Sequence, residues 1–313
     1  MRRAIVAAIL LALLALPVRA AAQQNSILNL YDAFGTGRQG TTLDWGFSAL
    51  VHYNGKTILF DSGNNADIFE RNVRALGVNL KRIDFAVLSH RHNDHASGLD
   101  YLLKANPNVK LYLPEDNALG APYNWVLWHE PAEARKELPA EQLYFRGEKQ
   151  SVLYQPGERF PHANREFVGS SREIAPGVYV IVTRSPLMGD FSKYPPHEND
   201  PQLSGLPELS LALVTSKGLV ILTGCSHSRV EVIVAEAKKF LNKDVDLVMG
   251  GFHLLPYDAD YIRNLVQRMK SELGVRRVAP AHCTGHLGFL IFRELYGENY
   301  SYAGLGAEVK FSN

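Results

Sequence analysis

The sequence predicts an α/β fold (α+β by some schemes), and three observations support this class. Five short apolar segments, rich in β-branched residues and bounded by glycine or proline, are typical of buried strands. A histidine, cysteine or aspartate follows each of them within a few residues. The segments between them repeat apolar residues at helical spacing. We therefore expect strands and helices that bring polar side chains together at one edge.

Each predicted strand can be paired with the polar residues that follow it. The pairs are 56–60 with Asp61, 83–88 with His90 and His92, 218–223 with Cys225 and His227, 245–249 with His253, and 275–279 with His282. Helices are expected over 65–76 and 230–241, and from a cap at Asp258 to a stop at Gly274. Because sites in α/β proteins gather beyond the carboxyl ends of strands, we expect the polar side chains to converge.

The chain has 313 residues, and its 46% hydrophobic and 21% charged residues are typical of a globular protein. Two arginines near the N-terminus precede an apolar run over 4–16, and Arg19 is followed by three alanines over 20–22. This is the pattern of a secretory signal peptide over 1–22, with cleavage after Ala20 as the alternative. The apolar run is too short for a comfortable membrane span, so no stable anchor is expected after cleavage, and an uncleaved N-terminal anchor is the alternative. We expect a secreted or periplasmic protein with one domain over 23–313.

Charge and cysteine content argue against two classes of protein. Without the signal peptide, 30 of the 33 lysines and arginines remain against 32 aspartates and glutamates, with no basic tract. Nucleic-acid binding is therefore not expected as a main role. We expect a small-molecule substrate instead. Cys225 and Cys283 are the only cysteines, which excludes a disulfide scaffold and leaves a single bridge open. The sequence leaves the oligomeric state open as well.

One stretch, about 114–172, breaks the alternation of strands and helices. It is rich in aromatic residues and prolines and lacks a periodic core. We interpret it as an insertion packed near the site, where aromatic side chains would suit a flat or apolar substrate. Ordinary packing of a loop-rich segment is the alternative interpretation.

The segment Ser89-His-Arg-His-Asn-Asp-His95 indicates that the protein binds metal. Neutral imidazole and carboxylate are ligands that zinc and other borderline divalent metals accept. Residues two apart in extended chain point to the same side, so His90 and His92 can bind one ion together. Asp94 and His95 follow and could hold a second ion close by. We expect two zinc ions, with manganese or iron as alternatives.

These motifs resemble those of the metallo-β-lactamase superfamily. Ser89–His95 is similar to its H-x-H-x-D-H signature, and Ile58–Gly63 is similar to its first motif, an aspartate at a strand end. Thr223–His227, Gly250–Leu254 and Pro280–Gly285 resemble a subgroup of metal-dependent hydrolases related to the dihydropterin ribofuranosylaminobenzene-phosphate synthase. The resemblance implies an αββα sandwich of two mixed sheets flanked by helices, with a metal site at one edge.

Matching the motifs residue by residue implies two metal sites. The implied ligands are His90, His92 and His227 for one ion, and Asp94, His95 and His282 for the other. Cys225 stands where many relatives carry a bridging aspartate, so it is either a ligand or a neighbour of the ligands. The occupancy of the second ion therefore stays open. Asp61 is a further ligand, a carboxylate that orients a ligand histidine, or a plain cap or turn residue.

The resemblance implies a metal-dependent hydrolase, in which a metal-bound hydroxide attacks an ester, lactone, amide or phosphoester, and the signal-peptide pattern implies that it is exported. Asp94 would orient the nucleophile or accept its proton. His253 would stabilise the developing negative charge, and a satisfied buried histidine is the alternative for this residue. A transferase acting on a pterin or aromatic amine, like the named synthase, is a second interpretation. A non-catalytic metal- or ligand-binding protein is the third.

Overall fold

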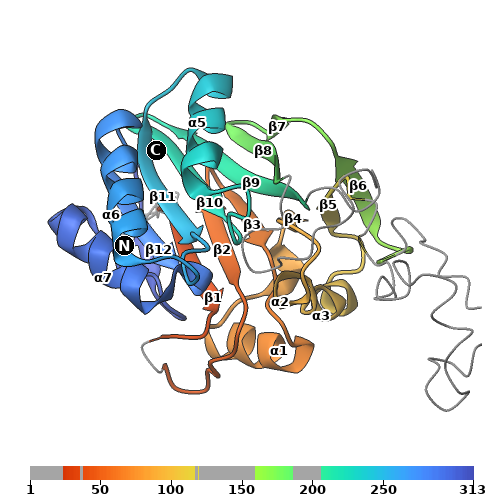
Figure 1. Cartoon of the computed structure of the whole chain (residues 1–313). Helices are drawn as coiled ribbons and strands as arrows, with labels where there is room; N and C mark the ends of the chain where they lie inside the picture. Colours follow the sequence, from red (N-terminus) through yellow and green to blue (C-terminus); the bar gives the residue numbers. More distant parts are fainter. Residues whose placement is uncertain (1–23, 36–37, 117–118, 120–158, 186–205) are drawn as a thin grey trace, which may run out of the picture.

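Two β-sheets stack face to face and carry helices on their outer faces, as the computed structural model of the chain shows (Figure 1). The structure describes residues 24–35, 38–116, 119, 159–185 and 206–313. The signal peptide predicted over 1–22 and most of the predicted insertion lie outside the described residues.

Among the described residues, the first sheet has seven strands and the second has six. In spatial order, the first sheet consists of β13 (Glu308–Lys310), β1 (Ser26–Tyr31), β2 (Ser48–Tyr53), β3 (Lys56–Phe60), β4 (Phe85–Val87), β5 (Lys110–Pro114) and β6 (Asn164–Val168). The second consists of β12 (Arg277–Ala281), β11 (Val245–Gly251), β10 (Gly218–Thr223), β9 (Leu206–Thr215), β8 (Val178–Ser185) and β7 (Arg172–Ala175). Both sheets are mixed, because β3 to β6 and β10 to β12 run parallel while the other neighbours run antiparallel.

Helices cover the outer face of each sheet (Figure 1). The first sheet is covered by α1 (Ala66–Ala75) and α3 (Leu99–Ala105), and the second by α5 (Val230–Leu241), α6 (Ala259–Gln267) and α7 (Gly285–Tyr296). The shorter elements are η1 (Leu80–Arg82), α2 (Asn93–Ala96), the π-helical η5 (Arg268–Glu272), η6 (His282–Thr284) and η7 (Gly297–Asn299). Within the described part of the chain, no helix has the length and apolar character needed to cross a membrane.

The three predicted helices are present, with ends set by capping side chains. Asp258 caps α6, because its carboxylate accepts a hydrogen bond from the N–H of Tyr261 at 2.9 Å. The side chain of Asn65 caps α1 by accepting from two N–H groups of the first turn. Such acceptors satisfy donors that the first turn of a helix leaves unpaired. The helix predicted over 230–241 has these same bounds in α5.

The predicted strands 56–60 and 218–223 match β3 and β10, whereas the other three differ at their ends. Strand 83–88 shortens to β4, 245–249 extends into β11, and 275–279 shifts to β12. The last shift has a local cause. The N–H of Val275 donates to the carbonyl of Met269 at 3.0 Å, so Val275 still closes the preceding helical segment.

The predicted insertion over about 114–172 overlaps described strands at both ends. Pro114 is the last residue of β5, and β6 pairs with β5 in parallel. β6 is an edge strand whose residues are mostly exposed or half-buried, so its sequence lacks the apolar run that marks the other strands. Residues 164–168 therefore belong to the first sheet.

Three apolar clusters join the layers: one between the two sheets, one under α5 to α7, and one under α1 and α3. Pairing in register places the carboxyl ends of the parallel strands at one edge of each sheet. Phe60 lies opposite Val87 in the first sheet, and Thr223 lies opposite Gly250 in the second. The two edges also meet, because the N–H of Leu209 donates to the carbonyl of Ser89 at 2.8 Å.

Replacing Leu211 tests the cluster between the sheets. Leu211 lies on β9 and is fully buried, so Leu211→Ala should lower the free energy of unfolding by about 3 kcal/mol through lost burial and a residual cavity. Urea denaturation followed by circular dichroism measures the change. Val232→Ala is the control, since Val232 is 40% exposed on α5 and should cost less than about 1 kcal/mol. Equal losses in both variants would contradict the assigned core.

Candidate metal centre

The histidine-rich motif lies between β4 and α3, at the carboxyl edge of the first sheet. His92 precedes the first residue of α2, and Asp94 and His95 lie within that short helix. The ring centroid of His90 lies 4.6 Å from that of His92 and 4.3 Å from that of His95. His90 and His95 are fully buried. The loop thus turns its three imidazoles toward one space.

The first ligand set joins His90 and His92 to His227, which follows β10 in the other sheet. One ring nitrogen of each residue lies within 4.8 Å of those of the other two. Nε2 of His90 is 3.1 Å from Nδ1 of His92. The ring centroid of His227 lies 4.9 Å from that of His90 and 4.8 Å from that of His92. The structure therefore brings together the three residues that the sequence assigns to one ion.

The second ligand set consists of Asp94, His95, Cys225 and His282, whose candidate ligand atoms lie within 4.8 Å of one another. Oδ2 of Asp94 is 3.4 Å from Nε2 of His282 and 3.7 Å from Nε2 of His95. Sγ of Cys225 is 3.1 Å from Nε2 of His95. Cys225 thus lies among the residues assigned to the second ion, with its sulfur facing the same space as their nitrogens.

The chemistry of the buried atoms fits a divalent metal. Both ring nitrogens of His227 are buried and have no hydrogen-bond partner among the described residues. Leaving a buried polar group unsatisfied costs about 1–3 kcal/mol, which a bond to a metal would offset. Imidazole, carboxylate and thiolate are all ligands of zinc, and two adjacent sets supply enough of them for two ions.

Electrostatics keeps most of these ligands ready to bind a cation. Burial lowers the pKa of His90 and of His227, and it lowers the pKa of His92 to about 4, so these imidazoles are neutral. Burial acts against the charged form of Asp94, but His95 and His282 hold the pKa of its carboxyl well below the usual range. Burial likewise opposes the charged form of His95, yet Asp94 and Asp61 raise its pKa to about 9. Asp94 and Asp61 thus favour the protonated form of His95, and a metal that binds its Nε2 would have to displace a proton.

Asp61 orients the histidine-rich motif through contacts to Ser89 and His95. Its Oδ2 lies 2.7 Å from Nδ1 of His95 and also accepts a hydrogen bond from the hydroxyl of Ser89 at 2.7 Å. Its Oδ1 accepts from the N–H of Ser89 at 2.7 Å. With both oxygens engaged, Asp61 leaves Nε2 of His95 facing the second ligand set. Of the roles expected for Asp61, this geometry favours that of a carboxylate that orients a ligand histidine.

Two more buried carboxylates hold the loops that carry His227 and His282. Glu208 on β9 accepts hydrogen bonds from the N–H of His227 at 2.9 Å and of Ser228 at 2.7 Å. Asp32 accepts from the N–H of His282 at 3.1 Å and from the side chain of Asn29 at 2.9 Å. His282 has a φ of 46°, a conformation unusual for a residue with a side chain.

His253 lies beside both ligand sets. Its ring centroid is 4.3 Å from that of His227, and it forms a third group with Cys225 and Cys283 in which the candidate ligand atoms lie within 4.8 Å of one another. Its position next to the first set is compatible with contact to a substrate. The catalytic role expected for His253 stays a prediction.

Comparison with known proteins agrees with this geometry. Residues 43–186 match the model of the metallo-beta-lactamase superfamily. The crystal structure of Tm1679, described as a metal-dependent hydrolase of the beta-lactamase superfamily, covers 92% of this chain and 100% of its own, with a TM-score of 0.65 and 25% identity. The chain contains a metallo-beta-lactamase superfamily domain. The family and the fold of two mixed sheets with flanking helices, expected from the sequence, are thereby confirmed.

Relatives of this superfamily domain span most of the chain. The 7,8-dihydropterin-6-methyl-4-(beta-D-ribofuranosyl)-aminobenzene-5'-phosphate synthase of Methanocaldococcus jannaschii is 28% identical over 296 residues, covering 85% of this chain and 88% of the synthase. An uncharacterized protein of the same organism is 26% identical over 270 residues, covering 83% and 91%. Zn²⁺-bound PqqB from Methylobacterium extorquens shares the fold, with a TM-score of 0.51, 14% identity and coverage of 91% and 100%.

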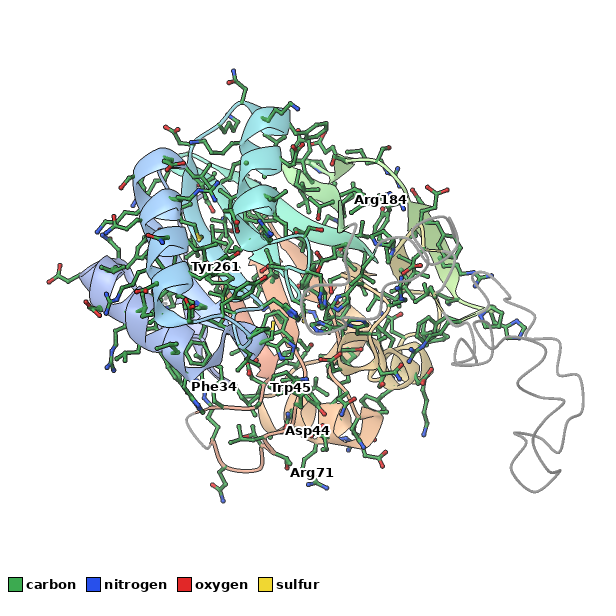
Figure 2. All side chains as sticks on the ribbon, in the orientation of Figure 1. Phe34, Asp44, Trp45, Arg71, Arg184 and Tyr261 are labelled. Carbon is green, nitrogen blue, oxygen red and sulfur yellow. The ribbon has the colours of Figure 1, made fainter. Side chains whose placement is uncertain are left out.

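Sequence reasoning missed three residues that border the candidate metal centre. Asp32 follows the apolar strand β1 directly, so the rule that found the other strand-end residues could have found it. Glu208 is a lone carboxylate within the buried strand β9, which is itself a signal. The ring centroid of Trp45, labelled in Figure 2, lies 4.8 Å from that of His282, and no sequence pattern marked this residue.

Glu208→Gln should weaken metal binding without unfolding the protein. The amide keeps one acceptor oxygen but turns an NH₂ group toward a backbone N–H, which loosens the loop that carries His227. We expect zinc affinity to fall about 10–100-fold, as for other residues that orient metal ligands. Competition with a chromophoric chelator measures the affinity, and Glu236→Gln, at an exposed position on α5, is the matched control. Unchanged zinc affinity in Glu208→Gln would contradict the role of this carboxylate in positioning His227.

Proposed function

We propose that this protein is a metal-dependent hydrolase that acts on a small-molecule ester, lactone, amide or phosphoester. The observation that carries the proposal is the pair of adjacent ligand sets at the edge where the two sheets meet. Divalent metals in such sites polarise a carbonyl or phosphoryl oxygen and activate water for attack. The match to the superfamily and the similarity to a structure described as a metal-dependent hydrolase support it further.

In this proposal some residues bind the metal ions and others transfer protons or stabilise charge. We assign the first set to one zinc ion and the second, with Cys225, to another; manganese and iron are the alternatives. Asp94 is the one member of the second set that is not fully buried, with 18% of its side chain exposed. This carboxylate can therefore reach a substrate and accept a proton from the attacking water. His253, whose ring lies beside that of His227, would stabilise negative charge that develops on the substrate.

A synthase-type transfer is the second candidate, and a specific observation favours it. A relative that is similar over 85% of this chain is named as a dihydropterin ribofuranosyl-aminobenzene-phosphate synthase. The corresponding reaction here would transfer a group to or from a pterin or an aromatic amine. Both candidates use the same ligand sets, so they differ in what accepts the transferred group.

Isotope labelling separates the two candidates. A panel of nitrophenyl esters, lactones, anilides and phosphodiesters is assayed in water enriched in ¹⁸O, with the protein in metal-free and zinc-restored forms. A hydrolase places ¹⁸O in the product only when metal is present, whereas a transferase forms product without the label when an amine acceptor is supplied. Stoichiometric metal binding with no turnover of any substrate would instead favour a non-catalytic metal-binding protein.

His92→Ala and Asp94→Asn should each lower kcat/KM on the best substrate of that panel by at least about 100-fold, because each removes a metal ligand or the proposed proton acceptor. Metal content and the circular dichroism spectrum are measured beside the rates. His52→Gln is the control, since His52 lies on β2 opposite Thr57, at the end of the strand away from the motif. Near-wild-type turnover in both variants would contradict the mechanism.

We also propose that the protein is exported and acts outside the cytoplasm, on the basis of the signal-peptide pattern over 1–22. Mass spectrometry of the protein expressed with its native N-terminus in a bacterium should find a periplasmic or secreted species beginning after Ala20 or Ala22. A full-length species that starts at Met1 and remains in the cytoplasm would refute export.

A further inference from the structure

We propose that Cys225 and Cys283 form a redox-modification site, which a hydroperoxide oxidises to a disulfide that withdraws Cys225 from the second ligand set. The formation of the bridge is independent of the proposed function, whereas its effect on metal binding rests on the assignment of Cys225 to that set. The inference gives a role to Cys283, which neither ligand set uses.

The fold places the two thiols side by side although they are distant in sequence. Cys225 follows β10 and Cys283 follows β12, and the parallel pairing of both strands with β11 brings their carboxyl ends together. The two sulfurs lie within 4.8 Å of each other, and the Cys283 thiol donates to the carbonyl of Cys225 at 3.5 Å. Both cysteines are free in the structure.

Gly251 makes room for the thiol of Cys283. A disulfide requires an S–S distance of about 2 Å, so the side chains have to turn toward each other. Gly251 at the end of β11 faces this space, because a Cβ built on it would lie only 2.8 Å from Sγ of Cys283. The absence of a side chain at Gly251 therefore creates the volume that the Cys283 thiol occupies.

Cys225 has two competing neighbours. Its sulfur lies 3.1 Å from Nε2 of His95, within the second ligand set, and within 4.8 Å of the sulfur of Cys283. A sulfur bonded in a disulfide is no longer a thiolate ligand, so bridge formation and metal binding at Cys225 exclude each other. By linkage, bound metal should slow oxidation, and oxidation should release metal.

The oxidation balances with a hydroperoxide as the co-reactant. One thiol gives its sulfur electron pair to the peroxide, whose O–O bond breaks, forming a sulfenic acid and releasing water or an alcohol. The second thiol then attacks the sulfenic sulfur. The S–S bond forms, the S–O bond breaks, and the hydroxyl leaves as water with the thiol proton. Hydrogen peroxide is small enough to suit thiols whose residues are only 3% and 1% exposed.

The test uses the full chain, reduced and metal-free or loaded with zinc, and treated with hydrogen peroxide. Intact mass and peptide mapping under non-reducing conditions report the bridge, and elemental analysis after desalting reports retained zinc. We expect loss of two hydrogen masses, a linked Cys225–Cys283 peptide, reversal by dithiothreitol, and bridging at least about tenfold slower in the zinc-loaded form. Cys225→Ser and Cys283→Ser are matched controls, which should give oxygen adducts and no linked peptide.

Oxygen adducts on separate cysteines of the wild-type chain, without a linked peptide, would overturn the proposal. A bridge that forms at the same rate with bound zinc, and leaves the zinc content unchanged, would overturn the coupling between the thiols and the metal set. Neither readout depends on turnover. A chain that bridges as expected and hydrolyses no substrate would therefore refute the proposed function alone.

Discussion

Imidazoles, a carboxylate and a thiol are buried together where the two sheets meet, and the site depends on how the cost of their desolvation is offset. Three buried carboxylates contribute most directly. Asp61 holds the motif loop, Glu208 holds the loop after β10, and Asp32 holds the N–H of His282. Each accepts hydrogen bonds from a segment that carries ligands. A metal would satisfy ligand nitrogens that these carboxylates do not reach, foremost one of the two on His227.

The same carboxylates offset backbone strain at the strand ends. Among the described residues, four of the eight non-glycine positions with positive φ border the site, and they are Asp61, Ser226, His253 and His282. Such conformations cost about 1–3 kcal/mol each and persist where the surroundings enforce them. Glu208 and Asp32 accept hydrogen bonds from N–H groups of the loops that contain Ser226 and His282. The same hydrogen bonds thus hold the strained backbone and place the metal ligands.

The fold class and the grouping of the ligands could be predicted from the sequence, because parallel strands leave a repeated signal: an apolar run followed by a histidine, cysteine or aspartate. The ends of three of the five strands could not, since hydrogen bonds such as that of Val275 to the preceding helical segment decide them. The polar edge strand β6 lacked the signal altogether. Contacts between distant segments could not be predicted either. No sequence pattern indicates that Glu208 contacts the backbone of His227 or that Cys225 lies beside Cys283.

Anomalous diffraction at a metal absorption edge, from crystals of the zinc-loaded protein, tests the central claim most directly. The account predicts one peak among His90, His92 and His227 and a second among Asp94, His95, Cys225 and His282, because these are the two sets whose ligand atoms converge. Peaks at other residues, or no peak in protein that retains zinc in solution, would contradict the assignment of this edge as a metal centre.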